Sequence, residues 1–133
     1  MGETVQKNVL PLGIFGWFVM VLIYKIVEIT TWRQAIVEGR LKGAAIDLQD
    51  GYIHLSAADQ VEETARRYFA TMENLLLVAF NSADFGDALK WEASRGGALF
   101  PHIYGTLNPA SALWEKPLMW RGGRHWFPED WRG

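Results

Sequence analysis

The sequence predicts an α+β domain in which two helices pack against a mostly antiparallel sheet. Segments with strand and helix patterns follow one another in the order β-α-β-α-β-β-β. Short stretches such as 52–56 and 89–94 alternate apolar and polar residues with a period of two, which is typical of half-buried strands. The chain has 133 residues, 50% of them hydrophobic, and this is enough for one domain with its own core.

The composition excludes several classes of protein. Cysteine is absent, so disulfides, thiolate zinc sites, iron–sulfur clusters and cysteine nucleophiles are excluded. The formal net charge of -2 lacks the basic footprint of a protein that binds nucleic acid, so we expect no nucleic-acid partner. The high apolar fraction and the low net charge also argue against intrinsic disorder.

The N-terminal region is unusually apolar, because positions 8–24 carry no charged side chain. A spanning helix needs about 20 apolar residues, and this shorter run contains a proline and two glycines, so we expect no stable membrane span. No signal-peptide cleavage site follows it, and we expect a cytoplasmic protein. Residues 20–27 have the β-branched and aromatic composition of a buried strand. We therefore predict an apolar extension at residues 1–19 and a domain that begins at Met20.

The first predicted helix follows this strand. Thr30 or the threonine after it can cap the helix, and Gly39 sits where a left-handed C-cap belongs. Its apolar residues at positions i, i+3 and i+4 are Trp32, Ala35 and Ile36. Gly43 and the Asp50-Gly51 pair signal turns, so we expect a turn-rich connection up to the next strand, at 52–56.

The second predicted helix comes directly after that strand. Ser56 and Asp59 have the spacing of a capping box, and the helix should run to about Thr71. Two ion pairs at i, i+4 spacing should line its solvated face: Glu62 with Arg66, and Glu63 with Arg67.

The second half of the chain is rich in strands. Residues 75–80 form a continuous apolar run, which is typical of a central strand. A polar, glycine-containing loop separates this run from the alternating stretch at 89–94. Gly96-Gly97 then predicts a hairpin to a strand at 100–104.

The domain is predicted to span residues 20–117, and a tryptophan-rich tail follows at 118–133. Around this tail aromatic side chains alternate with arginines: Trp114, Trp120, Arg121, Arg124, Trp126, Phe127, Trp131 and Arg132. Such side chains can stack on bases. Tryptophan also supplies a large apolar area, so the tail could instead dock over the core. A homodimer contact is a third interpretation.

The candidate functional residues gather around two histidines, His54 and His102. Each lies in the middle of an alternating strand, on the face opposite the aliphatic residues. Hydroxyl groups lie two positions away, on Tyr52 and Ser56 around His54 and on Tyr104 beside His102. If these faces line one cleft, they concentrate titratable and hydrogen-bonding groups there. They could equally be ordinary polar residues on the solvent face of a sheet.

Glu92 is the candidate carboxylate partner of these histidines, since it lies on its own alternating strand. Its ordinary interpretation is a surface acid near Lys90.

Several strings of residues resemble a small bacterial family known only as domain of unknown function 952. The resemblance covers roughly residues 22 to 110, and the strings around His54 and His102 are its most specific parts. The strings are Ile23-Tyr24-Lys25-Ile26, Trp32, Ala35, Asp50-Gly51-Tyr52-Ile53-His54-Leu55-Ser56, Gln60-Val61, Thr64-Ala65, Leu89-Lys90-Trp91-Glu92 and Phe100-Pro101-His102-Ile103-Tyr104-Gly105. The family looks related in fold to the ADP-ribosyltransferases, which implies a split, mostly antiparallel sheet with a cleft for a nucleotide.

The resemblance implies NAD as a possible substrate of an ADP-ribosyltransferase or NAD glycohydrolase. Loss of nicotinamide leaves an oxocarbenium-like ribose, which needs a donor, an aromatic surface and a nearby carboxylate. His54 resembles the histidine that these enzymes carry on an early strand. The catalytic candidates are therefore His54, His102 and Glu92, which is the best acid available by position, and the nucleotide-binding candidates are Tyr52, Ser56 and Tyr104.

Other functions stay open on the same residues. A non-catalytic module that binds a small ligand or a partner would need the same surface. A metal site could use His54 and His102 with Glu92 or Asp47, but no metal-ligand spacing is present and we expect no metal. Serine hydrolysis through Ser56 lacks the Gly-x-Ser-x-Gly turn.

Overall fold

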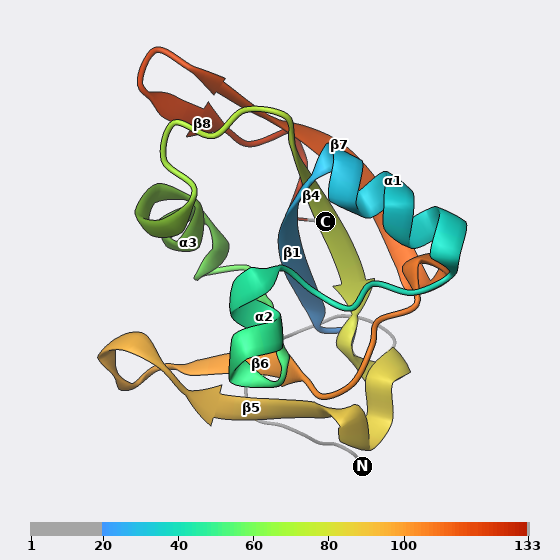
Figure 1. Cartoon of the computed structure of the whole chain (residues 1–133). Helices are drawn as coiled ribbons and strands as arrows, with labels where there is room; N and C mark the ends of the chain where they lie inside the picture. Colours follow the sequence, from blue (N-terminus) through green and yellow to red (C-terminus); the bar gives the residue numbers. More distant parts are fainter. Residues whose placement is uncertain (1–19, 133) are drawn as a thin grey trace.

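Two antiparallel sheets form the frame of the computed structural model, which describes residues 20–132 (Figure 1). The larger sheet has the strand order β3-β1-β4-β7-β8. Its strands are β1 (Leu22–Glu28), β3 (Ser56–Ala57), β4 (Leu75–Asn81), β7 (Ala112–Arg121) and β8 (Arg124–Trp126). The predicted extension at residues 1–19 lies outside the described residues.

The smaller sheet has the order β2-β6-β5. Its strands are β2 (Ile53–His54), β5 (Leu89–Ala93) and β6 (Leu99–Ile103). A short 3₁₀ turn at Arg95–Gly97 joins β5 to β6, so the predicted hairpin at Gly96-Gly97 is confirmed. Two further 3₁₀ turns span Ser82–Ala88 and Pro109–Ser111. Every strand pair within the described residues is antiparallel, which confirms the predicted α+β class with a mostly antiparallel sheet.

β4 is the central strand of the larger sheet, as its apolar run predicts. β1 and β7 pair with it on either side. Because successive side chains of a strand point to opposite faces, its residues enter two different hydrophobic cores. Leu76, Val78 and Phe80 belong to the first core, and the residues between them belong to the second.

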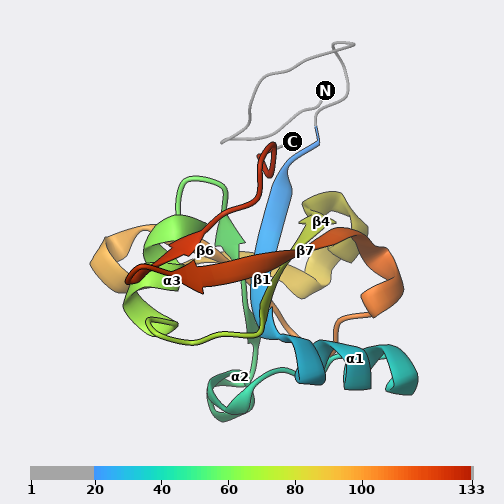
Figure 2. The ribbon, with the colours of Figure 1, turned by 90° about the horizontal axis from the view of Figure 1, so that it is seen from above.

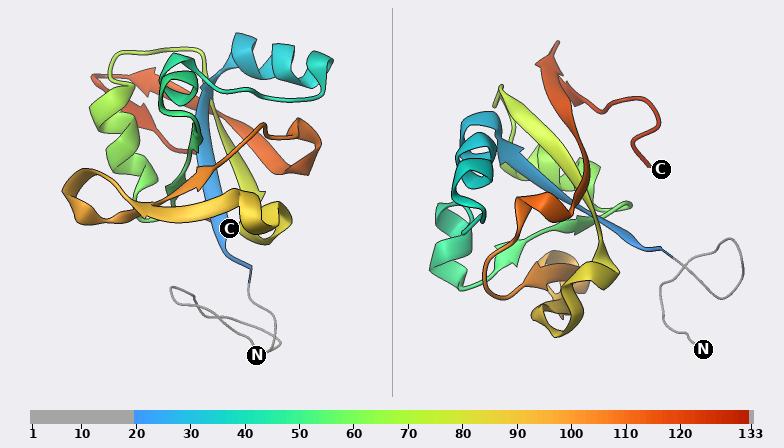
Figure 3. Two further views of the ribbon diagram at one scale, coloured as in Figure 1. Left: turned by 60° about the horizontal axis from the view of Figure 1, so that its bottom comes forward. Right: turned by 90° about the vertical axis from the view of Figure 1, so that its right-hand side faces the viewer.

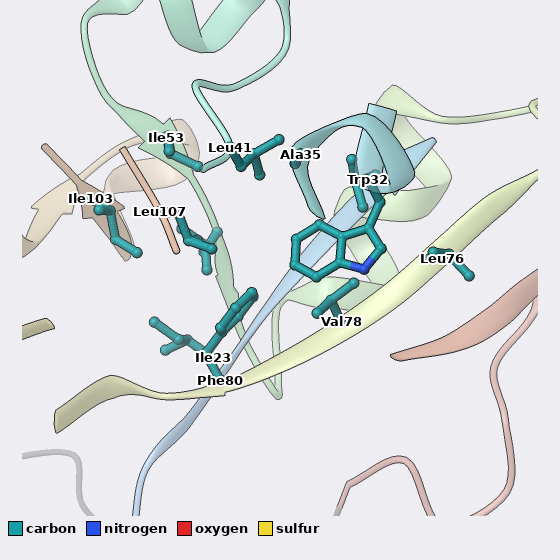
Figure 4. Close-up of a cluster of buried hydrophobic side chains, with 12 residues drawn as sticks. Ile23, Trp32, Ala35, Leu41, Ile53, Leu76, Val78, Phe80, Ile103 and Leu107 are labelled. Carbon is teal, nitrogen blue, oxygen red and sulfur yellow. The ribbon is translucent and has the colours of Figure 1, made fainter. Parts of the chain in front are cut away.

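The first core lies between the two sheets and α1 (Ile29–Glu38) (Figure 4). Trp32 of α1 packs against Phe80 with ring centroids 6.2 Å apart. Ile53 and Ile103 enter this core from the smaller sheet. The buried face of the smaller sheet is therefore the aliphatic one, and its polar face points away from the core.

Helix α1 differs from the predicted helix at its start. It begins at Ile29 with Glu28 as N-cap and without a side-chain cap bond, so neither threonine caps it. The C-cap at Gly39 is left-handed, as predicted, with a φ of 81°. Trp32 and Ala35 are buried, but Ile36 is half exposed because the helix presents only a narrow stripe to the sheet.

A third helix replaces part of the expected turn-rich connection. α2 (Ala45–Asp50) ends at Gly51, whose left-handed φ of 87° is consistent with the predicted turn there. Figure 2 shows α1 and α2 along one edge of the molecule. The amide of Ala44 donates to the Asp47 carboxylate at 2.8 Å, and this bond supports the first turn of α2.

Helix α3 (Val61–Tyr68) is shorter than predicted. Its N-cap is Gln60, and the predicted capping role of Ser56 is therefore wrong. The predicted pair of Glu63 with Arg67 is present at 2.6 Å. Glu63 also pairs with Arg66, while Glu62 pairs with Arg132 instead of Arg66.

The second core lies on the other face of the larger sheet, beneath α3 and the C-terminal segment. Figure 3 shows this segment and α1 on opposite sides of that sheet. Trp131 is 7% exposed and packs edge-on against Tyr24, with centroids 5.2 Å apart. The end of the chain is thus docked over a core. β7 runs through residue 117, where we expected the domain to end, without interruption.

Candidate functional site

One face of the smaller sheet carries most of the candidate side chains. His54 on β2 lies directly opposite His102 on β6, and directly paired residues of an antiparallel sheet project from the same face. Tyr52, Tyr104 and Glu92 lie two positions from His54, from His102 and from Lys90, the β5 partner of His102, respectively, and they share that face. We call this set the polar face: Tyr52, His54, Glu92, His102 and Tyr104.

Tyr52 is the centre of the aromatic contacts on the polar face. Its ring stacks on His102 with a centroid distance of 4.1 Å and an interplanar angle of 25°. Its centroid is 4.8 Å from that of His54 and 5.3 Å from that of Tyr104. His102 is buried, whereas Tyr104 is exposed. The outer surface of the polar face is therefore aromatic.

Glu92 is held by two neighbours. Nδ1 of His102 lies 2.7 Å from its Oε1, and the Tyr104 hydroxyl donates to Oε1 and Oε2 at 2.9 and 3.0 Å. The bond from His102 and then that from Tyr104 lower the pKa of Glu92. Its side chain is 36% exposed. The polar face thus presents a fixed, ionised carboxylate that a ligand can reach.

The two tyrosines of the polar face keep their protons at neutral pH. Burial, followed by the negative charges of Asp50 and Glu92, raises the pKa of Tyr52. The hydrogen bond to Glu92 is the largest cause that raises the pKa of Tyr104. Both rings therefore act as neutral aromatic surfaces, and the Tyr104 hydroxyl acts as a donor.

Both ring nitrogens of His54 face carboxylates. Nδ1 lies 2.6 Å from Oδ1 of Asp47, and Nε2 lies 3.0 Å from Oδ2 of Asp50. Because an ionised carboxylate only accepts hydrogen bonds, both bonds form together only when both nitrogens carry hydrogen.

Asp47 is a fully buried carboxylate that accepts four hydrogen bonds. Its Oδ1 accepts from the amide and Nδ1 of His54, and its Oδ2 accepts from the Ala44 amide and from Lys25 Nζ. Burial alone would raise the pKa of Asp47, but the bonds from His54 and the charge of Lys25 outweigh it and the net pKa is lowered. Asp47 is therefore ionised at neutral pH.

Lys25 supplies the buried counter-charge. It lies between Ile23 and Val27 on the face of β1 that enters the first core, and its side chain is 7% exposed. Its Nζ donates to Asp47 at 3.0 Å and to the backbone carbonyl of His54 at 2.9 Å. The buried ion pair thus joins strand β1 to helix α2, and the hydrogen bonds of its two members to His54 join both to strand β2.

The structure brings five of the six predicted site residues together, namely those of the polar face. Ser56 goes elsewhere, because the chain changes sheets after His54. It lies in β3 opposite Tyr24, and its hydroxyl is 3.1 Å from the Thr64 hydroxyl. Within the described part of the chain, no interaction joins Ser56 to the polar face. Its role in the site stays a prediction.

Three residues of the site, Lys25, Asp47 and Asp50, were not predicted from the sequence. Asp47 was named only as a possible metal ligand. A lysine inside an otherwise apolar strand is the one local signal that could have drawn attention to Lys25. Its partner Asp47 lies 22 positions later in a segment that we expected to be a turn. Alternation shows which face a residue is on, but it does not show which distant charge neutralises it.

A metal centre has no support in the part of the chain that the structure describes, where no group of three or more His, Asp or Glu side chains could hold a metal ion. The two histidine rings that could have formed one have centroids 5.4 Å apart, and each bonds to a different carboxylate.

Comparison with known proteins places the chain among proteins without an assigned activity. A family model described as "Protein of unknown function (DUF952)" matches residues 26–128. No curated protein gives a significant match. None of the helices within residues 20–132 is both long enough and apolar enough to cross a membrane.

Solved structures of protein CC0527 from Caulobacter crescentus are similar to this chain. The crystal structure has 45% sequence identity and a TM-score of 0.77, and the match covers 79% of this chain and 93% of that chain. A crystal structure of a double methionine variant of CC0527 has the same identity and coverages, with a TM-score of 0.76. The solution NMR structure also has 45% identity, with a TM-score of 0.71 over 78% of this chain and 90% of that one.

Proposed function

We propose that this chain, which belongs to the DUF952 family of proteins of unknown function, binds an NAD-like nucleotide on the polar face and breaks its nicotinamide–ribose bond. The observation that carries the proposal is the carboxylate of Glu92. It is ionised, fixed by His102 and Tyr104, and reachable from solvent beside two tyrosine rings. Such a carboxylate can stabilise positive charge that develops on a sugar.

The tyrosine rings support the binding part of the proposal. The nicotinamide ring of NAD⁺ is flat and positively charged, and such rings bind to aromatic faces. Tyr52 is stacked on His102 and so is held in one orientation, and Tyr104 is exposed next to it. The charges of Asp50 and Glu92 near Tyr52 favour a cationic ring over a neutral one at that position.

The proposed reaction balances with water or another hydroxyl compound as the second reactant. The bond between the ribose C1′ and the nicotinamide nitrogen breaks, and its electron pair returns to the ring as neutral nicotinamide. The ribose carries positive charge in the transition state, opposite Glu92. Water or another hydroxyl nucleophile then forms the new C1′–O bond and releases one proton.

A second candidate function is non-catalytic binding of a small ligand on the same face. The observation that favours it is that both ring nitrogens of His54 are already bonded to carboxylates. A ring that is bonded at both nitrogens can stabilise the conformation of the binding surface without transferring a proton.

The test measures binding and cleavage separately in the full chain. Isothermal calorimetry measures NAD⁺ binding, and chromatography measures released nicotinamide. We expect Glu92→Gln to retain binding within about threefold and to lose nicotinamide release by roughly 100-fold or more. Glu73→Gln, which changes an exposed acid of the same type, should keep both.

The outcomes separate the two functions. Binding without release in the unaltered protein would favour the non-catalytic module. If the protein neither binds NAD⁺ nor releases nicotinamide, the nucleotide proposal is wrong.

A further inference from the structure

We propose that Asp47 is the positioning residue of His54. Together with Lys25 it determines which way the imidazole ring faces and keeps a hydrogen on Nδ1, so that Nε2 is the nitrogen presented at the surface. The effect of this positioning on a ligand rests on the proposed function. The positioning itself does not, because it is a property of the protein without ligand.

The two carboxylate oxygens of Asp47 have separate tasks. Oδ1 accepts from the backbone amide of His54 at 3.0 Å and from its Nδ1 at 2.6 Å, so it fixes both the chain and the ring of one residue. Oδ2 accepts from Lys25 Nζ at 3.0 Å and from the Ala44 amide at 2.8 Å. Four donors therefore converge on this carboxylate, which has about four acceptor sites.

Lys25 determines which atom of the side chain at position 47 faces away from His54. Burial lowers the pKa of Lys25, and the charge and hydrogen bond of Asp47 oppose this shift and favour the ammonium form. An oxygen must therefore face Lys25 in any folded state that keeps the charge. Lys25 also donates to the backbone carbonyl of His54 at 2.9 Å and so holds that residue from its other side. The ring of His54 cannot leave Asp47 without leaving a buried carboxylate with fewer donors.

Asp47→Asn is the variant that tests this arrangement, because an amide has the shape of the carboxylate but only one accepting oxygen. The oxygen should face Lys25, since the alternative places an amide nitrogen against a buried cation. The amide nitrogen then faces two groups of His54, the backbone N–H, which can only donate, and Nδ1, which must give up its hydrogen to accept. His54 should therefore change from a ring that carries hydrogen on Nδ1 to the Nε2–H tautomer.

Nuclear magnetic resonance of the full chain labelled with ¹⁵N in histidine measures the tautomer directly. The chain has 3 histidines, and the spectrum of His54→Gln assigns the signal by its absence. We expect a hydrogen-bonded Nδ1–H resonance from His54 in the unaltered protein and its loss in Asp47→Asn. A residue with only a structural role would lower stability without changing the tautomer.

A double variant provides a rescue. In Lys25→Met/Asp47→Asn the cation is gone, so one donor remains on the Oδ2 side and two remain on the His54 side. The amide oxygen should turn towards His54, and the Nδ1–H resonance should return. Asp50→Asn is the matched control, because Asp50 contacts only the outer nitrogen, and it should keep the Nδ1–H resonance.

The proposal is overturned if folded Asp47→Asn keeps the Nδ1–H resonance. If Asp47→Asn does not fold, Lys25→Met/Asp47→Leu replaces it, since that variant has neither a buried charge nor an acceptor at position 47. Loss of the resonance there supports the proposal, and its retention contradicts it. Neither result depends on NAD⁺, so failure of the proposed function and failure of the positioning are distinguishable.

Discussion

Burial of Lys25 costs free energy, but its contacts fix the geometry around His54. A buried ammonium loses its hydration, which costs several kcal/mol before any partner is counted. Its contacts with Asp47 and with the His54 carbonyl offset that cost. A buried ion pair of this kind adds little net stability compared with apolar residues, but removing one partner costs about 3–5 kcal/mol. Its contribution is therefore to the geometry around His54.

The lowered pKa of Asp47 predicts a loss of stability in acid. The unfolded chain holds this carboxyl at a pKa of about 3.9, above its value in the folded protein, so protons bind preferentially to the unfolded state. The stabilising contribution is complete above the unfolded value and disappears as the pH falls through the folded one. Urea unfolding between pH 7 and pH 3 should show stability falling below about pH 5.

Two variants show whether this loss comes from Asp47. Lys25→Met/Asp47→Leu should lose less stability over the same pH range than the unaltered protein, because the titrating carboxyl is absent. Asp84→Asn, which changes an exposed acid, should show the same pH dependence as the unaltered protein. Equal slopes for the unaltered protein and the double variant would contradict the role given to Asp47.

The polar face could be predicted in part from single residues. Alternation correctly placed His54 with Tyr52, and His102 with Tyr104, on faces away from the aliphatic side chains. The direct pairing of His54 with His102 could not be predicted, because register between strands 48 positions apart depends on the whole sheet. The Asp47 contacts were missed because Asp47 lies in α2, in a segment that we expected to be a turn.

At the scale of elements, α2 is the piece that brings the site together. Gly43 precedes it with a φ of 115°, a conformation that favours glycine. A Cβ at this position would lie 2.5 Å from Cβ of Asp47, which is closer than two carbon atoms can approach. The backbone before α2 thus passes directly over the carboxylate that holds His54.

Gly43→Ala should therefore lower the free energy of unfolding by about 2–4 kcal/mol, since strain at a positive φ adds to overpacking. Gly39→Ala is the matched control, because Gly39 also has a positive φ but has open space around its Cβ position. It should cost only about 1 kcal/mol. Thermal or urea unfolding measures both values, and equal costs would show that the contact with Asp47 is unimportant.

Helices and strands could be predicted where a local sequence pattern was long. The prediction failed where one short stretch of chain contributes to two sheets. β4 has a continuous apolar run, and β1 has one that only Lys25 interrupts; both strands are buried over most of their length, and both were predicted. The stretch at 52–56 was predicted as one strand, but it contributes His54 to one sheet and Ser56 to the other. A change of sheet within three residues leaves the alternation intact, so the pattern cannot reveal it.

At the scale of the whole molecule, the larger sheet separates two cores with different tasks. The first core holds the smaller sheet and the ion pair of Lys25 with Asp47 in place. The second core packs α3 and the end of the chain against the opposite face. The polar face belongs to the sheet that packs on the first core. Substitutions in the second core should therefore change the polar face only if the whole domain unfolds.

Trp131 provides the test of this separation. It is buried against Tyr24 and near Phe127, whose ring centroid is 5.1 Å away. Trp131→Ala should lower the free energy of unfolding by about 3 kcal/mol, because a buried aromatic side chain is lost and a cavity remains. Arg132→Ala changes an exposed neighbour and should cost less than about 0.5 kcal/mol. Trp131 packs against one face of β1, at Tyr24, whereas Lys25 contacts His54 from the opposite face. The Nδ1–H resonance of His54 should therefore be unchanged in folded Trp131→Ala, and its loss would show that the two cores are coupled.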